Sequence, residues 1–219
     1  MKKTIFTIVI TIIELLFVYG TIMLLANQNE KNIKCVYIDP GHGGFDGGTY
    51  VGSTIEKDIT LNVSCYIASM LEGSGYKVYM TRNKDEALGT NKRDDMHKRV
   101  KMINESQANL YISIHVNSFP NKSVFGSQVF YNAKSENNKT FAQTIMKNIK
   151  IIDETNKRTE HEIKDKYLTD NVNITGCLIE LGFLSNANDF KKLTSEEYLY
   201  DLSRVIYLGI VEYFDYLKY

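Results

Sequence analysis

The sequence contains no tryptophan, two prolines and three cysteines among 219 residues, and its formal net charge is zero because 26 basic residues balance 26 acidic ones. Without an excess of basic residues, the chain lacks the broad positive field that draws proteins to nucleic acid. Without tryptophan, it also has no indole platform for stacking. We therefore expect no nucleic-acid partner.

The cysteines, Cys35, Cys65 and Cys177, lie far apart and show none of the paired spacing of a structural zinc site. Cys35 and Cys177 fall in expected core strands and Cys65 in an expected helix, so we interpret all three as small buried hydrophobic residues. Their odd number argues against a scaffold built on disulfides, although one disulfide stays possible if the domain is exported.

An apolar stretch follows Lys2 and Lys3 and continues to residue 26, with Glu14 as its one charge. A run of about 23 residues spans roughly 34 Å as a helix, enough for a bilayer core. It is long for a cleaved signal, so we predict a signal anchor over residues 1–26, with a cleaved signal peptide as the alternative. Residues 27–32 would be a linker, and 33–219 a domain outside the cytoplasm, either membrane-anchored or secreted.

Short apolar runs alternate with amphipathic segments throughout residues 33–219, where one substantial core can form. This order predicts a single α/β domain whose twisted, mostly parallel sheet of about six strands has helices on both faces. The expected strands are 33–38, 77–80, 110–115, 126–131 and 176–180, with a doubtful one at 164–170. The expected helices begin near residues 58, 91, 136 and 195. The charged stretch 150–175 is either a mobile rim or a surface that becomes ordered on a partner.

Four polar residues, His42, Glu56, His115 and Glu180, each lie at the end of an apolar run. In open α/β sheets, ligands bind in the crevice beyond the carboxyl ends of the strands. Two imidazoles and one carboxylate form a catalytic zinc set with a fourth position left for water, and a further carboxylate can serve as the base. The sequence therefore predicts a metallohydrolase.

Each of these residues also has a more ordinary interpretation. His42 lies in a glycine-rich turn, and Glu56 in the first turn of a helix, where the helix dipole favours a carboxylate. Glu180 is harder to explain in this way, because its apolar neighbours imply a half-buried side chain, and buried glutamates are rare unless paired or functional. The alternative for Glu180 is a salt bridge to Arg82 or Arg99.

Four motifs carry a resemblance to a known family: Ile-Asp-Pro-Gly-His-Gly-Gly at 38–44, Glu-Lys-Asp-Ile at 56–59, Ser-Ile-His-Val-Asn-Ser at 113–118, and Glu-Leu-Gly-Phe-Leu-Ser-Asn at 180–186. In their order and spacing, the chain resembles the zinc-dependent N-acetylmuramoyl-L-alanine amidases of type 3 from about residue 33 to its carboxyl end. Its short length and its amino-terminal apolar segment resemble the spore-cortex members of that family.

The resemblance implies one zinc ion held by His42, Glu56 and His115, with Glu180 as the catalytic carboxylate. It implies hydrolysis of the amide that joins the lactyl group of N-acetylmuramic acid to the L-alanine of the stem peptide. In the spore-cortex members this cut precedes muramic lactam formation. Peptidoglycan would then be the substrate, and the forespore intermembrane space of a spore-forming Gram-positive bacterium the location.

Three further residues are candidates for substrate binding. Asn117 either donates a hydrogen bond to substrate or holds the loop after His115, and Arg82 and Arg99 either meet stem-peptide carboxylates or form ordinary ion pairs. The rival functions are a zinc carboxypeptidase that acts on stem peptides and a membrane-tethered wall-binding module without activity. An enzyme that needs an accessory activator protein is a third possibility.

Overall fold

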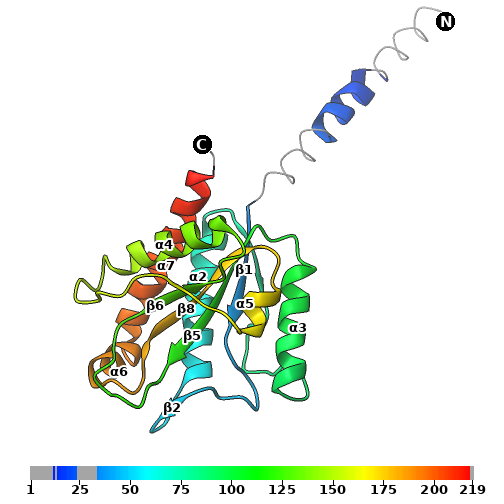
Figure 1. Ribbon diagram of the computed structural model, residues 1–219. Coiled ribbons are helices and arrows are strands. Elements are labelled where there is room, and N and C mark those ends of the chain that lie inside the picture. Colours follow the sequence, from blue (N-terminus) through cyan, green and yellow to red (C-terminus); the bar gives the residue numbers. More distant parts are fainter. Residues whose placement is uncertain (1–11, 13, 24–33, 218–219) are drawn as a thin grey trace, which may run out of the picture. The chain divides into compact units, whose positions relative to one another are not determined.

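The computed structural model describes residues 12, 14–23 and 34–217 (Figure 1). The chain divides after Ile33 into two units, and the second unit, Lys34–Tyr219, contains the elements described below. Among the helices that the described residues form, none is both long and apolar enough to cross a bilayer. Most of the predicted anchor (1–11, 13 and 24–26) and the whole linker, 27–32, lie outside the described residues, so both stay predictions.

Within residues 34–217, one sheet contains six strands in the order β4-β1-β5-β8-β6-β7. The strands are β1 (Cys35–Pro40), β4 (Lys77–Met80), β5 (Leu110–Asn117), β6 (Gln128–Tyr131), β7 (His161–Glu162) and β8 (Thr175–Phe183). β4, β1, β5 and β8 are parallel, whereas β6 is antiparallel to β8 and parallel to β7. A separate hairpin pairs β2 (Tyr50–Val51) with β3 (Thr54–Ile55). This confirms the predicted α/β domain with a mostly parallel sheet.

Helices cover both faces of the sheet, as Figure 1 shows. One face is covered by α2 (Glu56–Gly73), α4 (Glu136–Ile149) and α7 (Glu196–Tyr216). The other face is covered by α3 (Lys92–Asn104) and α5 (Tyr167–Asn171). The short helix α6 (Ala187–Leu193) follows β8. The helices at 91, 136 and 195 begin as predicted because Asn91, Ser135 and Ser195 each accept a hydrogen bond from a backbone N–H of the first turn.

The alternation of side chains along β1 explains the two cores. Val36 and Ile38 point into the larger core, under α2, α4 and α7, whereas Cys35 and Tyr37 point into the smaller core, under α3 and α5. Every residue of β1 is buried, as expected for a central strand of a parallel sheet. The sheet is therefore rigid where the loops of its carboxyl edge begin.

The prediction of a strand at 164–170 is wrong. Residues 161–162 form β7, and α5 begins at Tyr167. Leu168 and Val172, four residues apart, are buried in the smaller core, because side chains at that spacing share one face of a helix. The stretch 150–175 therefore contains β7 and the short helix α5, which its high charge made hard to predict from the sequence.

All three cysteines are free. Cys35 and Cys177 are buried, as predicted, but Cys65 is exposed on α2. The prediction that Cys65 is a core residue is wrong, because its position on α2 faces solvent, whereas Ile59, Val63 and Ile67 face the sheet.

Candidate active site and metal centre

His42 lies in the loop after β1 with a backbone φ of 62°, in the left-handed region that favours glycine. A non-glycine residue costs about 1–2 kcal/mol in this region, so the surrounding structure must hold it there. The hydrogen bond from Gly43 N to Asp46 O (2.8 Å) closes the turn, and Arg99 Nη2 donates to His42 O at 2.6 Å. These contacts fix where the imidazole points.

Glu56 is the first residue of α2 and is buried. Backbone groups from two other segments hold its carboxylate, because Thr49 N donates to Oε2 at 2.8 Å and Val116 N donates to Oε1 at 2.9 Å. Burial alone would raise the pKa of Glu56, but His115 and His42 lower it well below its usual value. The carboxylate is therefore ionised, as a metal ligand must be.

His115 is near the end of β5, where the pairing of β5 with β8 shifts register between His115 and Asn117. A bulge at a strand end redirects the side chains around it, and such bulges gather next to active sites. The imidazole ring of His115 also needs free space on the side that faces the loop after β1. Gly41 provides this space, because a Cβ at Gly41 would lie 2.4 Å from His115 Cε1.

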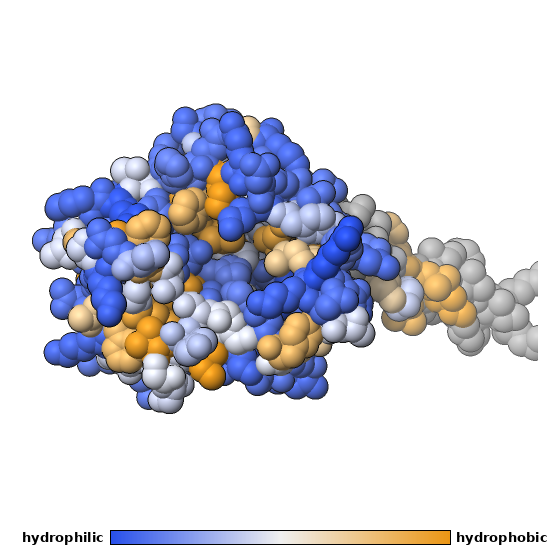
Figure 2. Space-filling model, turned by 60° about the horizontal axis from the view of Figure 1, so that its bottom comes forward, coloured by the Kyte–Doolittle hydropathy of each residue, from blue (hydrophilic) through white to orange (hydrophobic). Residues whose placement is uncertain are grey.

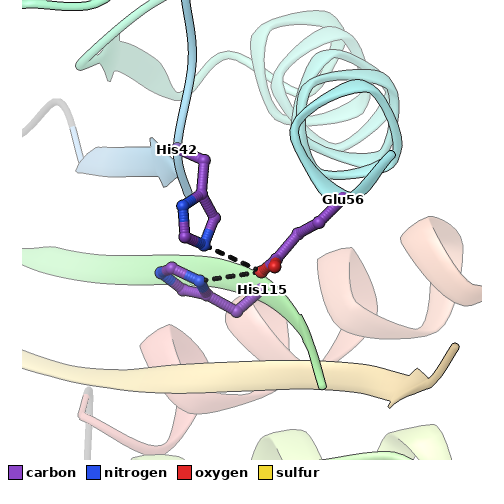
Figure 3. Close-up of side chains that lie close together, drawn as sticks. All are labelled: His42, Glu56 and His115. Carbon is purple, nitrogen blue, oxygen red and sulfur yellow. Dashed lines mark hydrogen bonds and ion pairs between the residues drawn. The ribbon is translucent and has the colours of Figure 1, made fainter. Parts of the chain in front are cut away.

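The three side chains converge on one point (Figure 3). Glu56 Oε1 lies 3.2 Å from His42 Nε2 and 3.1 Å from His115 Nδ1, and the three ligand atoms lie within 4.8 Å of one another. Zinc–ligand bonds of about 2.0–2.1 Å in a tetrahedral site place two ligand atoms roughly 3.3 Å apart. The donor types and their spacing therefore fit a zinc ion.

Asp46 orients His42 and was missed from the sequence. His42 Nδ1 lies 2.8 Å from Asp46 Oδ2, and Lys92 Nζ lies 2.8 Å from Asp46 Oδ1. Burial would raise the pKa of Asp46, but its hydrogen bonds from Lys92 and His42 lower it to about 2. An ionised partner at Nδ1 keeps the proton there and leaves the lone pair of Nε2 for a metal. The one signal in the sequence was an aspartate four residues after His42 in the same turn.

Glu180 is on β8, paired in register with His115 on β5. Its Oε2 is buried and has no hydrogen-bond partner among the described residues. Burial raises the pKa of Glu180 to about 7. The salt bridge to Arg82 or Arg99 that the sequence left open is not formed, so the buried oxygen has no structural explanation in the described part of the chain.

Arg82 and Arg99 are buried beneath the loop that carries His42. Arg82 donates to the carbonyl oxygens of Pro40, Gly41 and Lys57 at 3.2, 2.8 and 2.8 Å. Arg99 donates to Asp39, Pro40 and Asp95 at 2.7, 2.7 and 2.6 Å. Their burial argues against the predicted contact with substrate, and their hydrogen bonds instead hold the turn in place.

Asn117 lines the cleft but also holds its own loop. Its side-chain Oδ1 accepts a hydrogen bond from Ser118 N at 2.7 Å, and its carbonyl oxygen accepts one from Leu184 N at 2.9 Å. These contacts support the structural role that the sequence left open for Asn117, and its side-chain amide stays a candidate for binding substrate.

The site opens into a cleft of about 520 Å³ at the carboxyl edge of the sheet. Its lining includes His42, Glu56, His115, Glu180, Asn117, Ile163, Lys166 and Tyr167. Figure 2 shows this end of the molecule, with apolar groups scattered among polar ones around a central hollow. Three convergent ligand atoms beside an unpaired buried carboxyl oxygen, open to a cleft, are the arrangement expected of a metal-dependent hydrolase.

Comparison with known proteins identifies the family. Residues 36–212 match the N-acetylmuramoyl-L-alanine amidase family, Amidase_3, and the chain belongs to this family. It is 41% identical over 189 residues to the germination-specific N-acetylmuramoyl-L-alanine amidase of Bacillus subtilis (strain 168), a match that covers 83% of this chain and 80% of that relative.

Two solved structures show the same fold. The CwlD amidase of Clostridioides difficile, solved in complex with the GerS lipoprotein, matches with a TM-score of 0.80 and 34% identity over 83% of this chain and 98% of that one. The amidase AmiC2 of Nostoc punctiforme matches with a TM-score of 0.75 and 28% identity over 83% and 97%. The family predicted from the four motifs is thereby confirmed.

Proposed function

We propose that this protein hydrolyses the amide between the lactyl group of N-acetylmuramic acid and the L-alanine of the stem peptide. His42, Glu56 and His115 would hold one zinc ion, and Glu180 would carry the proton. Membership of the amidase family supports the reaction. The observation that carries the assignment of roles is the convergence of three ligand atoms beside a buried carboxyl oxygen without a partner.

The residues of the chain have distinct tasks in this reaction. When bound, zinc would polarise the scissile carbonyl and lower the pKa of the attacking water to near 7. Glu180 takes a proton from that water as the new C–O bond forms, and returns it to the nitrogen of L-alanine as the C–N bond breaks. A nearby dication favours the ionised form of Glu180, which the first of these steps needs.

The rival functions have less support. The carboxypeptidase was expected to bind the terminal carboxylate through Arg82 or Arg99, and neither arginine is among the described residues that line the cleft. A wall-binding module without activity would have no use for an ionisable side chain that is buried without a partner. The amidase accounts for both observations.

We extend the proposal to the setting of the reaction. Similarity to a germination-specific amidase supports action on spore-cortex peptidoglycan ahead of muramic lactam formation. The site would then lie outside the cytoplasm, in the forespore intermembrane space, with the chain anchored by residues 1–26 or secreted. Since a relative was solved with a lipoprotein, we also propose an accessory protein as a partner.

The test is mass spectrometry of purified peptidoglycan after digestion by the full-length protein, with zinc quantified in the same preparation. Release of intact stem peptides that begin with L-alanine, lost on adding a chelator, is the expected result. Shortened stems that remain joined to muramic acid would instead identify a carboxypeptidase. Zinc binding without any cleavage would point to a binding module.

A further inference from the structure

The cleft contains one basic side chain besides its histidines. Glu56 and Glu180 contribute carboxyl groups, and Lys166 is the single lysine or arginine among the described residues that line the cleft. The Lys166 side chain is exposed, and its ammonium group makes no hydrogen bond or ion pair with another described residue. A positive charge at the rim of such a cleft attracts a peptide that carries free carboxylates.

The backbone at Lys166 is held in place. Lys166 precedes α5, whose Leu168 is buried in the smaller core, and the Tyr167 ring lies 4.8 Å from the ring of His97 on α3. Asn104 on α3 donates to the carbonyl of Asn171 at 2.8 Å, which fixes the other end of α5. The exposed side chain of Lys166 therefore lines the cleft from a backbone that is held in place.

Helix formation does not explain a lysine at this position. Lys166 is the N-cap residue of α5 and makes no capping hydrogen bond through its side chain. Lysine is not among the residues favoured at N-caps, where serine, threonine, aspartate and asparagine provide an acceptor for a backbone N–H. The positive charge of Lys166 also lowers the pKa of Glu180, so it acts in the same space as the catalytic carboxylate.

The chemistry of the stem peptide identifies a partner for this charge. With the scissile amide over the metal ligands and Glu180, the residue after L-alanine lies one residue length away, so its groups come within roughly 7 Å of the reacting nitrogen. In stem peptides this second residue is a glutamate joined through its side chain, which leaves its α-carboxyl group either free or amidated. A free carboxylate there is in reach of a lysine at the rim.

We propose that Lys166 binds the free α-carboxylate of the second stem residue and makes the enzyme prefer stem peptides in which that group is not amidated. The inference rests on the proposed amidase function and deepens it by naming the substrate class. Lys166 takes the role for which Arg82 and Arg99 were candidates from the sequence.

The experiment compares two synthetic muramyl peptides, one with the free carboxylate and one with the amide, as substrates of the zinc-loaded full-length protein. Wild type should have the higher kcat/KM for the free acid. Lys166→Met should raise KM for the free acid about tenfold, the order expected for a lost charged hydrogen bond, with kcat little changed. Lys166→Met should leave kcat and KM for the amidated substrate unchanged, and Lys166→Arg should retain the preference for the free acid.

Lys164→Met is the matched control, because Lys164 is an exposed lysine two residues away that is not among the described residues lining the cleft and pairs with Glu162 at 2.9 Å. Neither substrate should respond to this change. Equal losses on both substrates in Lys166→Met, or an unchanged preference, would overturn the inference alone. Failure of wild type to release either stem peptide would overturn the proposed function and this inference with it. Calorimetric binding of the two peptides to Glu180→Gln, with and without Lys166→Met, repeats the comparison without turnover.

Discussion

His115 on β5 lies opposite Glu180 on β8, and the two strands lose their register directly after this pair. The sheet thus places the proposed metal ligand and the proposed proton carrier on neighbouring strands, next to the irregularity in their pairing. Both roles therefore depend on strand geometry rather than on a flexible loop. Such support gives a site the positional accuracy that catalysis requires.

Replacing Glu180 by glutamine should separate chemistry from metal binding. The amide has nearly the same shape but accepts no proton, so we expect turnover of muramyl peptides to fall by at least about 10²-fold. Zinc content and the thermal unfolding midpoint should change little, because Oε2 has no partner to lose among the described residues. Glu197→Gln, an exposed charge removal on α7, is the control. An active Glu180→Gln enzyme would refute the proposed mechanism.

Replacing Asp46 by asparagine should weaken metal binding rather than the chemical step. The hydrogen bond at His42 Nδ1 would lose its ionised acceptor, and loss of such an outer-shell carboxylate costs about 10–100-fold in metal affinity. A zinc titration against a competing chelator measures the change, and saturating zinc should restore most of the activity. Lys92→Met removes a different partner of Asp46, one that does not contact His42, and should leave zinc affinity close to wild type. Equal effects of the two variants would contradict the role assigned to Asp46.

Two glycines offer a matched test of the space around Glu56 and His42, two of the proposed metal ligands. Gly48 and Gly52 both have positive φ, 71° and 60°, so alanine should strain the backbone by about 1–2 kcal/mol at either position. At Gly48, however, a Cβ would also lie 2.4 Å from Glu56 Oε2 and 2.7 Å from His42 Cδ2, whereas at Gly52 it would meet nothing within 4 Å.

Gly48→Ala should therefore lose zinc binding and activity, while Gly52→Ala should lose only stability. Chemical unfolding gives the stability of each variant, and zinc content per chain gives its metal binding. If both variants kept a full complement of zinc, the close packing of Gly48 against the ligands would not matter to the site.

The four main site residues were predictable because each ends an apolar run, and the carboxyl ends of parallel strands converge at one edge of the sheet. His42, after β1, and His115, on β5, follow that rule, whereas Glu56 reaches them from the first turn of α2, after the antiparallel hairpin of β2 and β3. Their roles nevertheless stay proposals. Asp46 escaped prediction because an aspartate in a glycine-rich turn is ordinary, and only the turn closed by Gly43 brings it to His42.

The arginines show what a linear pattern leaves undetermined. Arg82 follows β4 and Arg99 lies on α3, and the sequence left both open between binding substrate carboxylates and forming ordinary ion pairs. Whether an arginine near a cleft enters it or lies beneath it depends on which backbone carbonyls lack a partner. Here the loop that carries His42 exposes several carbonyls towards the protein interior, and the two guanidinium groups satisfy them.

The buried pair of Asp39 and Arg99 should make the protein sensitive to acid. Asp39 accepts hydrogen bonds from Arg99 Nη1, Thr81 Oγ1 and Ser113 Oγ, each at 2.7 Å. Burial alone would raise the pKa of Asp39, but Arg99 and the two hydroxyl groups lower it below its usual value. A carboxyl group whose pKa is lower in the folded state stabilises that state above its unfolded pKa of about 3.9, and this stabilisation is lost as the pH falls further.

Asp39→Asn should therefore destabilise the protein at pH 7 by about 3–5 kcal/mol, since it leaves the buried Arg99 with less compensating charge. The difference in unfolding free energy between wild type and Asp39→Asn should narrow below about pH 4, where Asp39 of the unfolded wild-type chain begins to take up a proton while folded Asp39 is still ionised. Urea unfolding from pH 7 to pH 3, with a chelator present so that metal release does not contribute, measures both quantities. A difference that stayed constant over this range would show that Asp39 contributes through its shape and hydrogen bonds, and that its charge is not what holds Arg99 beneath the loop of His42.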